Sequence, residues 1–342
     1  MGKKWDGDRG GRDQWVEWMA GSAREALRVA KPGAHALVWA LPRTSHWTAT
    51  AWENGGWEVR DRVSHLFGTG FPKSLDVAKA IQSGGGGLEA IRRMQMGDDY
   101  VPSGRGRVNY DHGGGSAMNG APGKDVVLSE AARLWDGFGT ALKPACEDWW
   151  LLRKPISEKN VAANVLRWGT GALDIDASRV HGEGGDSKGR FPAHVITDGS
   201  DEVRAAFPDA AGQLAKSRSD GSDTGNKVLG KMKNVGERAP RVESDKNASR
   251  FFYTSKPSRK ERDLGLGDCG GNTHNTVKSV ALLEYLIRMV TPPGGVVLDC
   301  FLGSGGTAIA AERLGHPWVG VELEAEHVEI AKKRIAAWRG KV

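Results

Sequence analysis

Residues 296–323, VVLDCFLGSGGTAIAAERLGHPWVGVEL, decide the fold that we predict for this chain. Val296 to Leu298 form a short apolar run, and Gly303 to Gly306 supply a turn. Thr307 to Leu314 then have the spacing of a helix, and a second apolar run extends from Trp318 to Leu323. The order of strand, glycine-rich turn, helix and strand predicts one βαβ unit.

Three explanations of the turn GSGGTA, which starts at Gly303, are open. Its spacing suits a dinucleotide, with Ala308 at the third small position and Glu322 placed for a ribose hydroxyl. Asp299 argues against that ligand, because its carboxylate would repel a pyrophosphate at the helix N-terminus. The same carboxylate favours a ligand with an ammonium or sulfonium group, and S-adenosylmethionine carries both. Alternatively, the glycines only allow the helix to pack closely on the strand.

The composition is that of an ordinary globular protein. The chain has 342 residues, 26% of them charged and 39% hydrophobic, which is enough for one large or two ordinary domains. No apolar run approaches the length of a membrane span, and the first residues lack the apolar core of a signal peptide, so we expect a cytoplasmic protein without a membrane partner. Cys146, Cys269 and Cys300 are far apart, which predicts neither a disulfide framework nor a zinc site.

The net charge of +6 is concentrated in one part of the chain. Residues 188–262 hold 16 Lys and Arg against 10 Asp and Glu, and the remaining residues are balanced. A basic segment of this kind fits a contact with a phosphate backbone, and a solvated linker would have the same composition.

Further elements are expected on both sides of this basic segment. Helices are predicted at residues 13–29 and 45–53, from Thr276 to the prolines at 292 and 293, and around residues 328–335; strands are predicted at 35–41 and 57–67. Residues 84–127 have too little apolar content for a core and are predicted to form a flexible insertion, with order returning near Leu128.

Nine segments, in their order and spacing, resemble one known family. They are LRVAKPGAHALVW, RTSHW, WEVRD, GTGFPKS, GTALKPACE, KNVAANVLRWGTGALDID, RFFYTSKPSRKER, HNTVKS and DCFLGSGGT. Together they resemble the permuted, or beta, class of phage and bacterial DNA amino-methyltransferases. The resemblance implies an α/β, Rossmann-like, S-adenosylmethionine-dependent methyltransferase fold that is circularly permuted, with the catalytic half first and the cofactor half last.

The resemblance also implies a domain order. Residues 1–83 would be the catalytic half, 84–127 a glycine-rich insertion, 128–155 a return to the core, 156–250 an irregular target-recognition region, and 251–342 the cofactor-binding half.

Candidate cofactor residues are carried over from the same resemblance. Asp299, Phe301, Gly303, Ser304 and Gly305 match the family segment that wraps the methionine end of the cofactor, Glu322 matches the acid that binds the ribose, and Thr276 and Lys278 match a further cofactor-binding motif. The chain departs from the family at Cys300, Asn275 and Ser279, where proline is usual, so both loops are expected to be less rigid.

The implied partner is double-stranded DNA, and the implied reaction is methyl transfer to an exocyclic amine, with adenine N6 favoured over cytosine N4. Candidate phosphate contacts are the basic residues Lys73, Lys256, Arg259, Lys260 and Arg262. The catalytic residues stay unassigned, because the Asp/Asn/Ser-Pro-Pro-aromatic motif with which this family holds the extruded base is missing from the sequence.

The position of this missing motif leads to a prediction about the sheet. In the family, the stretch that resembles MGKKWD lies just after the motif, so we expect Met1 to be an internal residue of a longer protein. The fold is then expected to lack the central strand between the strand that ends at Asp299 and the strand that contains Val38. Two alternatives to an active methyltransferase follow: an inactive relative that only binds cofactor or DNA, and a nicotinamide-dependent oxidoreductase.

Overall fold

The computed structural model describes most of the chain, namely residues 10–68, 70–71, 74–82, 129–181, 189–210, 244–255, 259–267, 271–274 and 277–340. The chain divides into two compact units: residues 1–69 with 145–342, and residues 70–144. The predicted insertion at residues 84–127 lies wholly outside the described residues, as do Lys73, Lys256 and Thr276.

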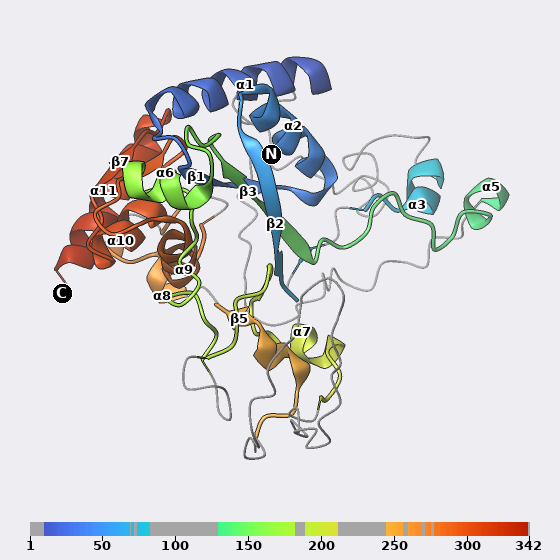
Figure 1. The fold of residues 1–342 in the computed structure, drawn as a ribbon. Helices are drawn as coiled ribbons and strands as arrows, with labels where there is room; N and C mark the ends of the chain where they lie inside the picture. Colours follow the sequence, from blue (N-terminus) through green and yellow to red (C-terminus); the bar gives the residue numbers. More distant parts are fainter. Residues whose placement is uncertain are drawn as a thin grey trace, which may run out of the picture. The chain divides into compact units, whose positions relative to one another are not determined.

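The larger sheet of the first unit has five strands in the order β1-β3-β2-β4-β5. These are β1 (His35–Ala40), β2 (Glu58–Leu66), β3 (Cys146–Arg153), β4 (Val195–Thr197) and β5 (Tyr253–Thr254) (Figure 1). Strand β3 is antiparallel to both of its neighbours, whereas β4 and β5 extend the sheet in parallel with β2. The two predicted strands at residues 35–41 and 57–67 are therefore confirmed as β1 and β2.

The opening stretch forms the predicted βαβ unit. Strands β6 (Val297–Asp299) and β7 (Trp318–Gly320) are parallel and form a separate two-stranded sheet, with α10 (Gly306–Arg313) between them in the chain. Helix α9 (Val280–Val290) precedes this unit and α11 (Ala325–Arg339) follows it. The mixed α/β fold predicted from the sequence is confirmed.

The remaining helices of the first unit are α1 (Arg12–Val29), α2 (Ser45–Asn54), α6 (Val161–Trp168), α7 (Asp201–Ala206) and the single turn α8 (Arg259–Arg262), with 3-10 turns η2 (Pro42–Thr44) and η4 (Ala248–Phe251). The second unit contains α3 (Val77–Gln82) and α5 (Glu130–Arg133), joined by a bridge between Asp76 and Gly139 and by a hydrogen bond from the Thr140 amide to Ser74.

One predicted boundary needs correction. The helix expected from Thr276 begins at Val280, because the Ser279 hydroxyl accepts a hydrogen bond from the Leu282 amide and caps the helix there. The glutamate side chain of Glu261 accepts a further hydrogen bond from the Val280 amide, so two partners define the start of α9.

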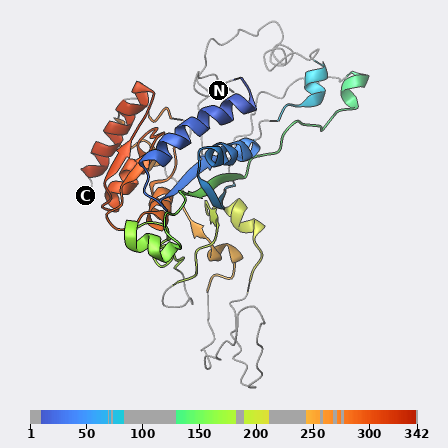
Figure 2. The same ribbon diagram turned by 45° about the horizontal axis from the view of Figure 1, so that its top comes forward.

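Helices cover both faces of the larger sheet, and β1 shows this most directly. Ala36 and Val38 pack against a cluster formed by α1, α2 and β3, whereas Leu37 and Trp39 pack against the cluster centred on α9. Figures 1 and 2 accordingly show α1 and α2 together and α9, α10 and α11 grouped apart from them. Strand β1 is thus sandwiched between two helical layers, as its nearly continuous apolar sequence predicts.

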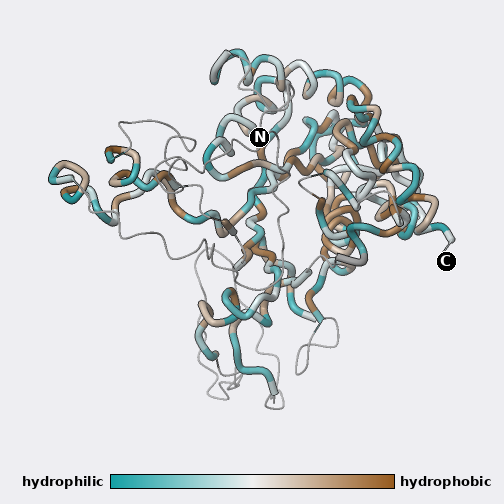
Figure 3. The backbone as a smooth tube through the Cα atoms, turned by 180° about the vertical axis from the view of Figure 1, so that it is seen from behind, coloured by the Kyte–Doolittle hydropathy of each residue, from teal (hydrophilic) through white to brown (hydrophobic). Residues whose placement is uncertain are grey.

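Helix α9 is the packing element that the two sheets share. It is largely apolar in Figure 3, and Leu282, Leu286 and Met289 are buried against α10, α11 and the strands. Val297 of β6 and Leu37 of β1 both pack against this cluster. The two sheets are therefore held in one unit by apolar contact with α9.

No ladder joins β6 to β1 in the described part of the chain. Strand β6 pairs with β7, and β1 pairs with β3, on one side each. This is the place where the sequence leads us to expect that a central strand is missing.

The stability of this unit is expected to fall in acid because of His35, the first residue of β1. Burial, with Arg153 and Arg60 nearby, lowers the pKa of His35 from 6.5 to about 4. Below pH 6.5 the unfolded chain binds a proton at His35, whereas the folded chain does so only near pH 4. The contribution of the neutral His35 to the unfolding free energy is therefore fully present above pH 6.5. It is lost as the pH falls towards 4, by about 3 kcal/mol in total.

We expect His35→Gln to flatten this part of the pH dependence. Urea unfolding at pH 7 and pH 4.5 measures the change in unfolding free energy, and the exposed His46→Gln is the matched control. An equal acid-induced loss in His35→Gln and in the parent chain would contradict the assignment.

Candidate functional site

Two acidic residues lie at the same edge of the smaller sheet. Asp299 ends β6, and Glu322 follows β7 on the neighbouring parallel strand. The Asp299 side chain accepts a hydrogen bond of 2.9 Å from the Phe301 amide, and its carbonyl accepts one of 2.9 Å from Val321. In parallel α/β sheets, ligands bind in the crevice beyond the carboxyl ends of the strands, which is where both carboxylates lie.

Glu322 is tied to the glycine-rich turn. One carboxylate oxygen accepts a hydrogen bond of 2.7 Å from the Gly303 amide, and the other accepts one of 3.0 Å from the Glu324 amide. The side chain is only 11% exposed. A carboxylate can accept about four hydrogen bonds, so Glu322 retains acceptor capacity for two ligand hydroxyls.

The glycines of the turn are needed by the protein itself. Gly303 and Gly305 have φ values of 54° and 81°, in the left-handed region that favours glycine. A Cβ on Gly303 would lie 2.7 Å from the His274 ring, and one on Gly305 would lie 3.1 Å from Ala331. The packing explanation therefore accounts for these glycines, and the case for a ligand has to be made from the acids and the helix start.

The first turn of α10 offers hydrogen-bond donors at this edge. The helix begins at Gly306, and its N-cap residue, Gly305, supplies no side-chain acceptor. The first amides of a helix have no partner within the helix and carry partial positive charge. They suit a negatively charged group such as the carboxylate of an amino acid.

Ser304, a predicted cofactor contact, faces the interior instead of the crevice. Its hydroxyl and carbonyl accept hydrogen bonds from the guanidinium of Arg334, on α11. Arg334 has 0% exposure and donates a further bond to the Glu261 carbonyl. Burial lowers the pKa of Arg334, and Glu261 and Asp263 oppose this effect. Arg334 therefore supports the turn from the side that faces the protein interior.

Arg334 is a site residue that we did not predict from the sequence. A signal for it exists, because Arg334 follows Ala331 by three residues and adjoins Ile335, so it lies on the apolar stripe of α11. A charged side chain on an apolar stripe predicts a buried polar partner, although the sequence does not say which one.

Lys278 extends to the larger sheet. Its ammonium nitrogen lies 3.1 Å from a Glu147 carboxylate oxygen on β3 and 4.2 Å from the centre of the Trp39 ring on β1. Burial lowers the pKa of Lys278, and Glu147 opposes this shift. Lys278 thus links the segment before α9 to two strands. Its role as a cofactor contact stays a prediction.

Two histidines lie next to the glycine-rich turn. His274 lies against Gly303 and packs edge to face on His327, with 4.8 Å between the ring centres. His327 is buried, and its Nδ1 lies 3.7 Å from a Glu322 oxygen. The segment that contains His274 therefore lies beside the glycine-rich turn, and its role in cofactor binding stays a prediction.

Phe301 borders the crevice as part of an aromatic cluster. Its ring is 52% exposed and lies 6.5 Å from Trp18 of α1. Trp18 in turn neighbours Trp15, which neighbours Trp47. This cluster offers apolar surface to a planar ring beside the turn.

Among the candidate DNA contacts, Arg262 is engaged within the protein. Its guanidinium donates hydrogen bonds to the carbonyls of Asn272 and His274, so it supports the segment next to the glycine-rich turn. The backbone of Arg259 and Lys260 forms part of α8. The role of these residues in DNA binding stays a prediction.

The part of the chain that contains this site is similar to known proteins. Residues 195–333 match the family model described as DNA methylase. The Type II methyltransferase M1.MboII of Moraxella bovis is 48% identical over 59 residues, which cover 17% of this chain and 23% of that protein. M2.DpnII of Streptococcus pneumoniae is 44% identical over 64 residues, which cover 19% of this chain and 24% of that protein.

These matches confirm, at the level of the family, the resemblance to DNA amino-methyltransferases. Each matched stretch spans less than a quarter of the relative's length. Among solved structures, the M1.HpyAVI–SAM complex is 15% identical with a TM-score of 0.40, covering 94% of this chain and 82% of that chain. PvuII DNA methyltransferase (cytosine-N4-specific) is 12% identical with a TM-score of 0.42, covering 94% and 71%. Likeness at such TM-scores determines neither fold nor activity.

Two further properties concern the described residues alone. In these ranges, none of the helices combines the length and the apolar character that crossing a membrane requires. The same ranges contain no cluster of His, Cys, Asp and Glu that is suited to a metal ion.

Proposed function

We propose that this chain binds S-adenosylmethionine and belongs to an enzyme that methylates an exocyclic amine of a base in double-stranded DNA. One observation carries the proposal. Asp299 and Glu322 lie at the carboxyl ends of adjacent parallel strands, and the turn between them is hydrogen-bonded to Glu322. This arrangement falls within residues 195–333, which match the DNA methylase family.

The residues of the crevice fit the chemical groups of that cofactor. Asp299 supplies negative charge for the ammonium and sulfonium groups, and the first amides of α10 suit the methionine carboxylate. Glu322 retains acceptor capacity for the ribose hydroxyls. When bound, the cofactor supplies a methyl group on a positively charged sulfur. The protein's own part is to bind and orient it.

In this proposal the acceptor is N6 of adenine, on the strength of the sequence resemblance, with cytosine N4 as the alternative product. An exocyclic amine is a poor nucleophile while its lone pair is delocalised into the ring. The base must therefore leave the duplex and meet hydrogen-bond acceptors. The exposed rings of Phe301 and Trp18 offer a stacking surface next to the crevice.

A second candidate function is binding without methyl transfer. The observation that favours it is the absence of a ladder between β6 and β1 in the described residues, together with the absence of a Pro-Pro-aromatic motif from the sequence. A chain of this kind would bind the cofactor or DNA and leave the bases unmodified.

Calorimetric titration of the full chain tests the cofactor assignment. We expect S-adenosylmethionine to bind and NAD⁺ to bind more weakly or not at all, because Asp299 repels a pyrophosphate. Tighter binding of NAD⁺ would overturn the proposal. Incubation with DNA and radiolabelled S-adenosylmethionine, followed by nucleoside analysis, then separates N6-methyladenine, N4-methylcytosine and the binding-only outcome.

A further inference from the structure

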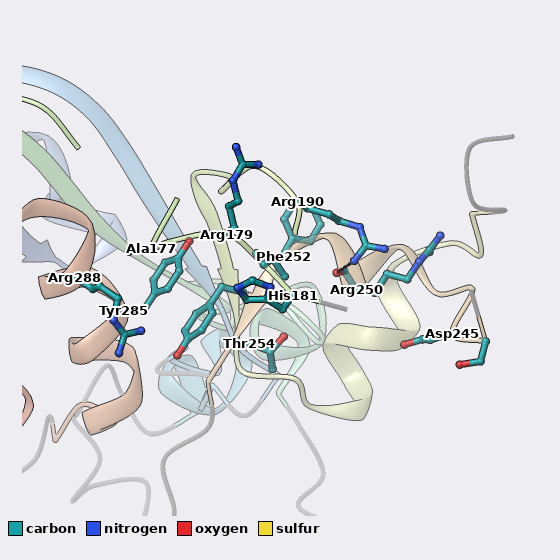
Figure 4. Close-up of a pocket in the computed structure, with 13 residues that line it drawn as sticks. Ala177, Arg179, His181, Arg190, Asp245, Arg250, Phe252, Thr254, Tyr285 and Arg288 are labelled. Atoms are coloured by element: carbon teal, nitrogen blue, oxygen red, sulfur yellow. Dashed lines mark hydrogen bonds between the residues drawn. The ribbon is translucent and has the colours of Figure 1, made fainter. Parts of the chain in front are cut away.

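A cavity lies in a part of the first unit that is not used by the proposed cofactor site. It has a volume of about 670 Å³ and is bounded by residues that precede β4 and β5 and by the side of α9. Its wall includes four arginines, Arg179, Arg190, Arg250 and Arg288, and the paired rings of Tyr253 and Tyr285 (Figure 4). A volume of this size is in the range of small-molecule sites.

The cavity is basic. Asp245 is the one acidic residue of its described lining, against four guanidinium groups, and it lies 3.2 Å from Arg204. Arg179 is paired with Asp176, which lies outside the lining. Repulsion between neighbouring guanidinium groups raises the free energy of the folded chain, and a bound anion would reduce this repulsion. Arginine matches the geometry of phosphate oxygens and binds them with paired hydrogen bonds.

Three of the arginines are held in place by the protein. Arg179 donates hydrogen bonds to Asp176 and to the Gly189 carbonyl, at 2.8 and 3.2 Å. Arg190 and Arg250 both lie over the ring of Phe251, at 5.3 and 4.3 Å, and Figure 4 shows them next to each other. Guanidinium groups that are fixed in advance lose little conformational entropy when they bind a ligand.

Arg288 completes the set from α9, on the opposite side of the cavity in Figure 4. It makes no hydrogen bond or ion pair with another described residue. All of its guanidinium N–H donors are therefore available to a ligand, whereas some donors of the other three arginines already bond to protein acceptors.

Tyr285 provides a second, independent sign of a ligand. Its ring stacks on Tyr253 with 3.8 Å between centres, and the residue is only 2% exposed. The hydroxyl finds no hydrogen-bond partner among the described residues. Burial, with Tyr253 beside it, raises the pKa of Tyr285 to about 12, so at neutral pH the hydroxyl keeps its proton and is a donor. An acceptor in the cavity would satisfy it.

The cavity is separate from the glycine-rich turn. The start of α9 lies beside that turn, since a Cβ on Gly306 would be 2.9 Å from Leu283. Tyr285 and Arg288 follow Leu283 by two and five residues, which is roughly 3 and 8 Å along the helix axis, and at about 100° per residue they project from the opposite side of α9. A group bound among the arginines would therefore occupy a different site from the cofactor.

We propose that this cavity binds the phosphate group of a nucleotide unit. The positively charged rim would hold the phosphate, Arg288 and the Tyr285 hydroxyl would donate to it, and the aromatic wall would border the sugar or base. Two sources share this chemistry, a phosphodiester of DNA and a free nucleotide. The choice of DNA as the principal source rests on the proposed function.

Two substitutions test the site with little risk to the fold. Arg288→Ala removes a side chain without a hydrogen-bonded partner, and Tyr285→Phe removes only a buried hydroxyl that lacks one. Arg28→Ala, on the exposed face of α1, changes the net charge by the same amount as Arg288→Ala and is the matched control. Thermal unfolding checks that all three variants fold.

The probes are a fluorescein-labelled DNA duplex, followed by anisotropy at fixed salt, and adenosine monophosphate, followed by calorimetry. We expect Arg288→Ala to weaken binding about tenfold and Tyr285→Phe about fivefold, as for lost hydrogen bonds to a charged group, with Arg28→Ala close to the parent chain. A loss confined to the duplex identifies DNA as the source, and a loss for the monophosphate identifies a free nucleotide.

The proposal is overturned if Arg288→Ala is no weaker than Arg28→Ala and Tyr285→Phe matches the parent with both probes. Titration with S-adenosylmethionine separates this result from a failure of the proposed function. If the parent chain does not bind that cofactor, the function fails while the phosphate site stands or falls on its own probes.

Discussion

Replacing Glu322 by alanine is expected to weaken the binding of S-adenosylmethionine about 100-fold. In the proposed site the variant removes the acceptors of two ribose hydroxyls, and hydrogen bonds to a charged group contribute about 1.5 kcal/mol or more each. It also releases the Gly303 amide, which Glu322 holds at 2.7 Å, so the turn loses the contact that links it to β7. Calorimetric titration of the purified chain measures the effect.

Two companion variants make this result specific. Glu322→Gln keeps the size of the side chain and one acceptor for the Gly303 amide, and it should fall between the parent and the alanine variant. Glu324→Ala removes a carboxylate two positions away and keeps the backbone amide that donates to Glu322. Equal affinity in Glu322→Ala, Glu324→Ala and the parent, with all three folded, would exclude Glu322 from the cofactor site.

Replacing Arg334 by methionine is expected to destabilise the first unit by about 3–5 kcal/mol, because each buried acceptor that loses its donor costs about 1–3 kcal/mol. The change leaves the hydroxyl and carbonyl of Ser304 and the carbonyl of Glu261 without their donor, and Arg334 and Ser304 are both buried. For a unit of this size, each kcal/mol lowers the melting temperature by about 2–4 °C. Thermal unfolding should therefore show a drop of about 6 °C or more.

Arg339→Met is the matched control for this prediction. It removes the same functional group from the same helix, where Arg339 pairs with Glu312 at the surface. Exposed ion pairs contribute little to stability, so its melting temperature should stay near that of the parent. We also expect Arg334→Met to bind S-adenosylmethionine more weakly, because the turn is held from behind by Arg334. A melting temperature equal to that of Arg339→Met would contradict the assignment.

The local elements of this fold could be predicted because their signals lie within short windows. The βαβ unit follows from apolar runs that flank a glycine-rich turn, and the first strand and the helix form within one residue of the predicted bounds, whereas the second strand ends at Gly320, three residues before the predicted end. The strand at 35–41 was similarly clear, because its unbroken apolar sequence is typical of a strand that is covered on both faces. The start of α9 was misplaced by one turn, since a cap depends on a single hydroxyl at Ser279.

The site could be predicted only in part. The sequence placed Asp299 and Glu322 near each other, because residues that follow adjacent parallel strands share one edge of the sheet. It did not reveal that Ser304 faces inward, that Arg334 supports the turn, or that Lys278 pairs with Glu147. Each of these contacts joins residues more than 25 positions apart, and a periodic pattern carries no information about such pairs.

The sequence by itself thus determined the class of fold, the position of the glycine-rich turn and the family resemblance, because periodicity, turn residues and short motifs are local properties of a chain. Only the tertiary structure decided which charges are buried, which glycines are required by packing, and where four arginines from three segments come together. The physical reason is that burial and electrostatic environment depend on the distance between segments that are remote in the chain. Those distances exist only once the sheets and α9 have packed together.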